Sequence, residues 1–263
     1  MRSKKSPLVS IVMNCYNGDR YLKKSIKSII SQNYKNWELI FWDNQSEDNS
    51  KNILKSFKDK RISYFKSKKF LKLYHARNLA IKKTRGKYIC FLDVDDYWTS
   101  DKLKRQVEYM NKNQQCMIIY SNYYVINEAK KKIYMRYKLG SLQSGYIAQE
   151  LLNDYKVGFL TTMMKKSLFE KYKFKQKYDI IGDFEFIIKI SLKYKIGCLQ
   201  KPLAYYRMHD YNYSKKIQIH LHELSNWIIV NKNLMNKLHL SYFQVRKFIL
   251  KLKVKNLLNI LGV

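Results

Sequence analysis

Short apolar runs alternate with segments of helical periodicity through the first part of this 263-residue chain. Strands that are separated by helices at this spacing pair in parallel, because each crossover helix covers a face of the sheet that the strands form. The alternation therefore predicts an α/β protein with a mostly parallel central sheet flanked by helices. The predicted strands lie at 7–14, 37–43, 61–67 and 87–93.

The pattern loosens after Asp101. Here we expect helices at 101–110, 146–154 and 184–194, an antiparallel pair of strands at 116–126 and 131–139, and an extended segment at 196–209. The Lys-rich segment 215–263 keeps an amphipathic periodicity, which predicts a helical C-terminal extension. In the first half, Gly86 is expected to end a helix over 74–86, because glycine is common just past a helix end.

The chain carries a formal charge of +32, from 52 Lys and Arg against 20 Asp and Glu. Nucleic acid, an anionic membrane and anionic small substrates would all complement this charge, and a composition bias towards Lys, Asn, Ile and Tyr is the alternative explanation. The four cysteines form no CxxC pair, which disfavours a structural zinc site. No apolar run approaches the ~18 residues of a spanning helix, and 8–13 is too short for a secretory signal core. We therefore expect a cytoplasmic protein, with contact at the inner face of the cell membrane as an open alternative.

Polar residues follow three of the predicted strands, in NCYNG, WDNQSED and DVDD. Ligands of parallel sheets bind beyond the carboxyl ends of the strands, so these polar ends are expected to share one site. Asp93, Asp95 and Asp96 follow the apolar residues 88–92, and buried carboxylates repel one another unless a cation compensates them. Their oxygen atoms suit Mg²⁺ or Mn²⁺. The alternative is that Asp96 or Asp101 caps the next helix.

The segments VSIVMNCYNGDRYLKKSIKSIISQNYKNWELIFWDNQSED and ARNLAIKKTRGKYICFLDVDDYW give this chain a family resemblance. It resembles the family 2 glycosyltransferases of bacterial polysaccharide and lipopolysaccharide synthesis, continuously over about residues 7–110 and in further pieces up to 214. The resemblance implies a nucleotide-diphospho-sugar transferase fold of the GT-A type. It implies a catalytic domain over 1–214, with a nucleotide-sugar-binding half at 1–110 and an acceptor-binding half at 111–214, followed by a basic C-terminal region at 215–263.

The resemblance also implies roles for particular residues. Asp95 and His209 would bind a Mn²⁺ or Mg²⁺ ion, and Asp93 would contact the ribose or the sugar. Arg77 would approach the nucleotide, with a solvated helix residue as the alternative. Asn44 stands where relatives usually carry a second aspartate, and because an amide both donates and accepts, uracil, thymine and other bases stay open. The full set of expected nucleotide-sugar contacts is Asn14, Tyr16, Asn17, Asp43, Asn44, Arg77, Asp93, Val94 and Asp95.

The catalytic base is expected at the start of the helix in IIGDFEFIIKI, residues 180–190. In the family an acidic pair at such a helix start supplies the base. Here Gly182 replaces the first acid, and the second, Asp183, is retained. The resemblance therefore implies Asp183 as the base, with Glu185 and Asp179 as alternatives. A helix N-cap is the other explanation for Asp183.

The resemblance therefore implies an inverting, metal-assisted glycosyltransferase. The donor is expected to be a nucleotide-diphospho-sugar, with UDP as the first choice, and the acceptor a hydroxyl of a glycan or lipid-linked molecule in cell-surface polysaccharide synthesis. A nucleotidyltransferase of related fold is the first alternative, although the N-terminal part has no Gly-rich basic loop for a triphosphate. A basic nucleic-acid-binding protein is the second, although no recognisable nucleic-acid-reading motif is present. We expect no nucleic-acid partner. The C-terminal region is expected to pack on the catalytic domain or to contact an anionic membrane.

Overall fold

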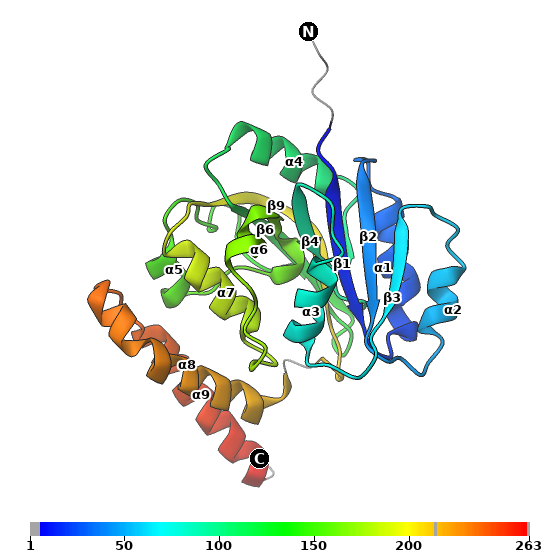
Figure 1. The fold of residues 1–263 in the computed structure, drawn as a ribbon. Coiled ribbons are helices and arrows are strands. Elements are labelled where there is room, and N and C mark those ends of the chain that lie inside the picture. The colour runs from blue at the N-terminus through cyan, green and yellow to red at the C-terminus, as the bar shows by residue number, and fades with distance from the viewer. Residues whose placement is uncertain (1–5, 213–214, 262–263) are drawn as a thin grey trace.

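The computed structural model describes residues 6–212 and 215–261. Its strands are β1 Val9–Cys15, β2 Trp37–Asp43, β3 Ile62–Lys66, β4 Tyr88–Phe91, β5 Tyr97–Trp98, β6 Ile118–Asn127, β7 Lys132–Met135, β8 Met163–Lys165 and β9 Ile196–Met208. Its helices are α1 Asp19–Ile30, α2 Ser50–Lys55, α3 Leu73–Ile81, α4 Lys102–Lys112, α5 Ala148–Asn153, the 3₁₀ helix η1 Phe159–Thr161, α6 Ser167–Lys171, α7 Gly182–Ser191, α8 Ile217–Lys237 and α9 Phe243–Leu261. The α/β class predicted from the sequence is confirmed (Figure 1).

The strands of the described residues form one mixed sheet, in the order β3-β2-β1-β4-β8-β6-β9-β5, with β7 paired to β6. Strand β1 pairs in parallel with β2 and β4, and β2 pairs in parallel with β3. The expectation of a mostly parallel sheet holds for this half, and β6 and β9 also pair in parallel, so the other half is mixed. Strand β8 runs antiparallel to both β4 and β6, and β5 runs antiparallel to β9. The predicted antiparallel pairing of the segments that form β6 and β7 is confirmed.

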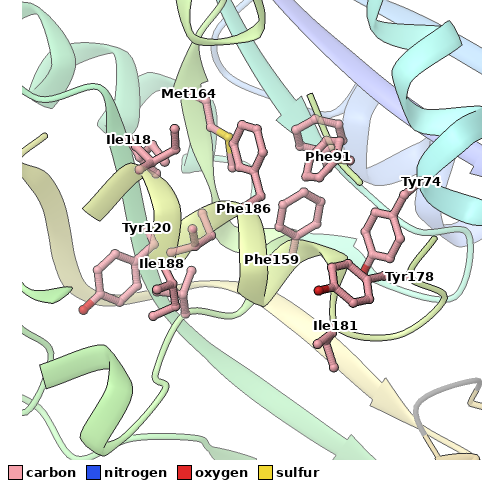
Figure 2. Close-up of a cluster of buried hydrophobic side chains, with 14 of the residues drawn as sticks. Tyr74, Phe91, Ile118, Tyr120, Phe159, Met164, Tyr178, Ile181, Phe186 and Ile188 are labelled. Atoms are coloured by element: carbon pink, nitrogen blue, oxygen red, sulfur yellow. The ribbon is translucent and has the colours of Figure 1, made fainter. Parts of the chain in front are cut away.

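Helices cover both faces of the sheet, which is why β1 and β2 are buried along almost their full length. Successive strand residues point to opposite faces, so Ile11 belongs to one core, with residues of α1, α2 and α4, whereas Val12 belongs to a second core, with residues of α3 and α5–α9. The second of these cores is rich in aromatic rings, including Tyr74, Phe91 and Phe159 (Figure 2).

The helix that was expected to end at Gly86 ends at Ile81 instead, so that expectation is wrong. Gly86 lies in the turn before β4. A Cβ atom added there would stand 2.6 Å from the backbone nitrogen of Ser10 and 2.7 Å from the carbonyl oxygen of Leu8. Glycine is therefore required for the close approach of this turn to β1. It does not end the helix, which stops five residues earlier, at Ile81.

The C-terminal region folds as two helices, α8 and α9, as the sequence predicts. Leu224 and Trp227 of α8 and Val245, Ile249 and Leu252 of α9 are buried in the same core as α7. The region therefore packs on the preceding domain. The predicted domain boundary at 214 falls at residues 213–214, outside the described residues. Within the described part of the chain, no helix is long and apolar enough to span a bilayer.

Candidate active site

The polar ends of β1, β2 and β4 meet at one edge of the sheet, as the sequence predicts. Cys15 at the end of β1 lies opposite Asp43 at the end of β2, and Val12 lies opposite Phe91 at the end of β4. In Figure 1 these ends point to the lower end of the sheet, on the side where α8 begins. The loops that follow the three strands therefore line one site.

The loops after β1 and β2 are tied to each other. The backbone N–H of Asn17 donates to Ser46 Oγ (3.1 Å), and Asn17 Oδ1 accepts from the N–H of Glu47 (2.9 Å). Two aromatic rings stand open beside these loops: Tyr16, 52% exposed, meets Phe70 edge to face at a centroid separation of 4.8 Å. Such a pair offers apolar ring surface to a planar base.

Four of the residues predicted to contact the nucleotide-sugar lie beneath or within the loops that follow the strands. Both oxygens of buried Asp43 are engaged, by the N–H of Ser46 (2.8 Å) and the hydroxyl of Tyr64 (2.6 Å). Asn44 donates to the carbonyl of Leu71 (2.7 Å) and accepts from its N–H (3.1 Å), so it organises the segment before α3. The buried amide of Asn14 has no hydrogen-bond partner among the described residues. The side chain of Val94 packs on Gly18.

Arg77 connects α3 to the acidic strand end. Its guanidinium is almost fully buried and donates to Asp93 Oδ1 at 2.8 Å, while the Asp93 side chain is 45% exposed. Burial acts to lower the pKa of Arg77, but Asp93 and the neighbouring Tyr74 and Asp183 outweigh it and raise that pKa. The alternative that Arg77 is a solvated helix residue is therefore wrong. Instead, Arg77 holds Asp93 at the open side of the site.

Asp95 and His209 lie together, although 114 positions separate them: Asp95 Oδ2 is 3.0 Å from His209 Nε2. The pairing of β5 with β9 brings the two segments together. Asp96 is buried and accepts from the backbone N–H of Arg207 (2.8 Å), so it ties the acidic loop to β9. Burial, followed by the charge of Asp95, raises the pKa of Asp96 well above its usual range.

The carboxylate of Asp95 and the imidazole of His209 are side chains that can bind a divalent cation. Burial, followed by repulsion from Asp93, raises the pKa of Asp95, whereas His209 lowers it. A cation would relieve this conflict. No group of three His, Cys, Asp or Glu side chains suited to a metal occurs in the described residues, so an ion at Asp95 and His209 would take further ligands from elsewhere. Mg²⁺ ions commonly bind in this way, through one or two carboxylates and substrate phosphates.

Asp183 lies in the first turn of α7 and faces α3. Its Oδ1 accepts from the hydroxyl of Tyr74 (3.2 Å) and from the N–H of Phe184 (2.8 Å). No side-chain cap hydrogen bond is formed at the start of α7, which speaks against an N-cap role for Asp183. Burial raises the pKa of Asp183, and the guanidinium of Arg77 opposes this rise. A carboxylate with a raised pKa is a better proton acceptor near neutral pH.

The structure explains the glycine that precedes Asp183. A Cβ atom at Gly182 would stand 2.5 Å from Cε2 of the buried Tyr74 ring. The two other acids considered as bases are committed elsewhere. Glu185 is buried and paired with Lys175 (2.8 Å), and Asp179 is paired with Lys72 (2.9 Å).

Sequence reasoning missed two contributors to this site. Tyr74 lies three residues before Arg77 on α3, so the two side chains share a helix face; one contacts Asp183 and the other Asp93. Phe70 is an exposed aromatic among lysines, and that contrast in FKSKKFLKL is the signal that could have identified it. For Tyr74, nothing in the local sequence signals the contact.

Comparisons with known proteins identify the family and the fold of this chain. The model of the family described as glycosyl transferase family 2 matches residues 10–190. An uncharacterised glycosyltransferase of Methanocaldococcus jannaschii is 31% identical over 239 residues, which are 89% of this chain and 81% of that protein. The UDP-Glc:alpha-D-GlcNAc-diphosphoundecaprenol beta-1,3-glucosyltransferase WfgD of Escherichia coli is 33% identical over 173 residues, 64% of each protein.

Solved structures show the same fold at low sequence identity. S. aureus TarS in complex with UDP-GlcNAc superposes with a TM-score of 0.68 at 14% identity, covering 84% of this chain and 66% of that one. The mannosyltransferase PcManGT from Pyrobaculum calidifontis, in complex with GDP-Man and Mn²⁺, gives 0.64 at 14%, covering 86% and 65%. This chain thus spans slightly less than two thirds of the length of WfgD, of the TarS 1–349 chain and of PcManGT. The predicted GT-A fold is confirmed. Because the family match covers more than half of the chain, the protein belongs to glycosyl transferase family 2 and is a glycosyltransferase.

Proposed function

We propose that the protein is an inverting glycosyltransferase that moves a sugar from a nucleotide-diphospho-sugar, with a UDP-sugar as the expected donor, to a hydroxyl of a glycan or lipid-linked acceptor in cell-surface polysaccharide synthesis. The observation that carries this proposal is that one face of α3 contacts both sides of the site. Through Arg77 and Tyr74 that face contacts the donor-side Asp93 and the candidate base Asp183. The relatives support the substrate classes, because WfgD is named for UDP-Glc and a diphosphoundecaprenol acceptor.

The donor would lie along the carboxyl ends of the strands. Its base would pack beside Tyr16 and Phe70, and Asp93 would accept hydrogen bonds from the ribose or the sugar. Asp95 and His209 would hold Mn²⁺ or Mg²⁺, whose charge would compensate the negative charge that develops on the departing diphosphate.

Asp183 would act on the acceptor. The acceptor oxygen attacks the anomeric carbon, the bond from that carbon to the diphosphate oxygen breaks, and the nucleoside diphosphate leaves with the electron pair. The proton of the acceptor hydroxyl passes to the Asp183 carboxylate. Attack from the face opposite the leaving group inverts the anomeric centre. The raised pKa of Asp183 suits this transfer near neutral pH.

Replacing Asp183 by asparagine tests the assignment, because it removes the proton acceptor and keeps the side-chain shape. We expect sugar transfer from UDP-Glc to GlcNAc-diphosphoundecaprenol to fall about 10²- to 10⁴-fold, while the calorimetric affinity for UDP with Mn²⁺ stays unchanged. Asp179→Asn is the matched control, since its carboxylate pairs with Lys72, and it should retain activity. Full transfer by Asp183→Asn would contradict the base assignment.

We further propose that α9 contacts an anionic membrane surface, where a lipid-linked acceptor would reside. Phe243, Leu250, Val254 and Leu257 are 53–65% exposed. At about 100° per residue these four positions fall within a sector of roughly 60°. Four basic residues flank the stripe: Arg246, Lys247, Lys251 and Lys253. The buried residues of α9 lie on the opposite side of the helix, and the helix contains no Asp or Glu. An apolar stripe between basic flanks matches the depth profile of an anionic bilayer surface.

Co-sedimentation with lipid vesicles tests this contact. The full chain should bind vesicles of phosphatidylglycerol and phosphatidylcholine and bind pure phosphatidylcholine more weakly, because each nearby Lys or Arg adds about 1 kcal/mol on an anionic surface. Leu250→Gln with Leu257→Gln should weaken the binding. Ile133→Gln, at an equally exposed apolar side chain of β7, should leave it unchanged. Equal binding to both vesicle types, or by the double variant, would refute the contact.

A further inference from the structure

Helix α8 reaches back to the turn that precedes α7. Glu223 of α8 is 5% exposed, and its carboxylate accepts from three consecutive backbone N–H groups. The N–H of Asp179 donates to Oε1 at 2.5 Å, and those of Ile180 and Ile181 donate to Oε2 at 2.9 and 3.0 Å. Ile181 is the residue immediately before α7. A side chain more than forty positions away thus satisfies the backbone N–H groups of the turn that leads into α7.

A second residue of α8 contacts the residue that follows Asp183. Trp227 lies four positions after Glu223, on the same face of the helix, and is 1% exposed. Its ring meets that of Phe184 edge to face, with centroids 5.1 Å apart. Phe184 directly follows Asp183. Helix α8 therefore contacts the chain before and after the candidate base.

The turn is held from α3 as well. The hydroxyl of Tyr74 donates to the carbonyl of Ile180 (2.8 Å), the residue whose N–H Glu223 binds. Both backbone groups of Ile180 are thereby fixed by side chains from two different helices. This double attachment leaves the start of α7 little freedom to shift relative to Arg77 and Asp93.

We propose that Glu223 and Trp227 are positioning residues that hold the Asp183 carboxylate in place for sugar transfer, so that the C-terminal region completes the active site. We call these two residues the α8 clamp. The inference rests on the proposed role of Asp183 as the base. The charged and titratable groups that act on Asp183 are Tyr74 and Arg77 of α3, Asp93 after β4 and Tyr155 before η1. If the clamp is lost, we expect the start of α7 to loosen and water to reach Asp183.

Replacing Glu223 by glutamine tests the α8 clamp with little change in volume. The amide keeps one acceptor oxygen and turns an N–H₂ group towards backbone donors, so at least one buried N–H loses its partner. We expect the rate of transfer from UDP-Glc to GlcNAc-diphosphoundecaprenol at saturation to fall at least about tenfold, because small misplacements of a reacting group are costly. The KM for UDP-Glc should stay unchanged. The ¹³Cγ titration of Asp183, assigned with Asp183→Asn, should move towards the ordinary aspartate value.

Glu38→Gln is the matched control. Glu38 is also a buried carboxylate with three hydrogen bonds, from Ser10 and from the N–H and Nε of Arg85. It should lose a similar amount of thermal stability and leave the Asp183 titration unchanged. If Glu223→Gln does not fold, Trp227→Phe serves in its place, with the same two expected effects. An unchanged Asp183 titration and unchanged transfer rate in a folded α8-clamp variant would overturn the inference. Full activity of Asp183→Asn would instead overturn the proposed function.

Discussion

A methyl group at position 182 has no space in this structure, which makes Gly182→Ala a sharp test of the site. The added Cβ would stand 2.5, 2.6 and 2.7 Å from three carbons of the Tyr74 ring. Tyr74 is 2% exposed, packs against Phe174 at a centroid distance of 5.6 Å, and bonds both Ile180 and Asp183 through its hydroxyl. The ring therefore cannot swing into solvent, and either it or the start of α7 has to shift.

The expected cost follows from two opposing effects. Overpacking a well-filled core costs about 1–3 kcal/mol, and alanine offsets about 1 kcal/mol of this because it is a better helix former than glycine. We expect a net loss of up to about 2 kcal/mol in the free energy of unfolding. Because the shift separates Tyr74 from Asp183, the transfer rate should fall by about tenfold or more, since a misplacement near 1 Å can cost about 100-fold.

Urea unfolding measures the stability, and sugar transfer with the proposed UDP-sugar donor and lipid-linked acceptor measures the rate per folded molecule. Gly197→Ala is the control, because its Cβ would stand 2.4 Å from the ring of Tyr109 in α4, outside the site. Tyr109 is only partly buried, so its ring can yield. This control should lose less stability and keep its transfer rate. A Gly182→Ala protein as stable and as active as the parent would refute the argument that Tyr74 links Gly182 to the base.

Two further predictions concern the metal site and a buried lysine. Asp95→Asn should weaken the calorimetric affinity for UDP about tenfold or more in the presence of Mn²⁺ and leave it unchanged without metal; equal affinity with Mn²⁺ would argue against Asp95 as a ligand. Lys102 is fully buried beside Gln106, and burial lowers its pKa from 10.5 to about 8. The folded state therefore binds this proton less well than the unfolded state, so its contribution to stability rises as pH increases from about 8 to 10.5, by about 3 kcal/mol. Lys102→Met should be more stable than the parent at pH 7 by up to this amount, less the lost contact to Gln106, and urea unfolding should show the difference shrinking towards pH 10; a pH-independent difference would contradict it.

The sequence by itself determined the parallel half of the sheet and the edge where its polar loops gather. Three strands of that half are short apolar runs, β3 mixes apolar and polar residues, and helical segments separate the four strands, so local pattern and global packing agree. The same pattern located Asp93 and Asp95 at the end of a strand, and the family resemblance pointed to Asp183 at the start of a helix. The sequence pattern did not predict the short strands β5 and β8, because two or three residues carry no periodic signal. Yet β5 brings His209 to Asp95, and β8 pairs antiparallel with β4 and so makes the sheet mixed.

Only the tertiary structure decided which partners these side chains have. The contacts of Tyr74 and Glu223 with the start of α7 span more than forty positions, and local propensity holds no information about such contacts. The same holds for Gly182, whose missing side chain is explained by a ring from α3. The C-terminal lysines and apolar residues were compatible with packing or with a membrane. The fold shows one face of α9 buried and the other exposed, because a helix that meets the domain along one side leaves the opposite side uncovered.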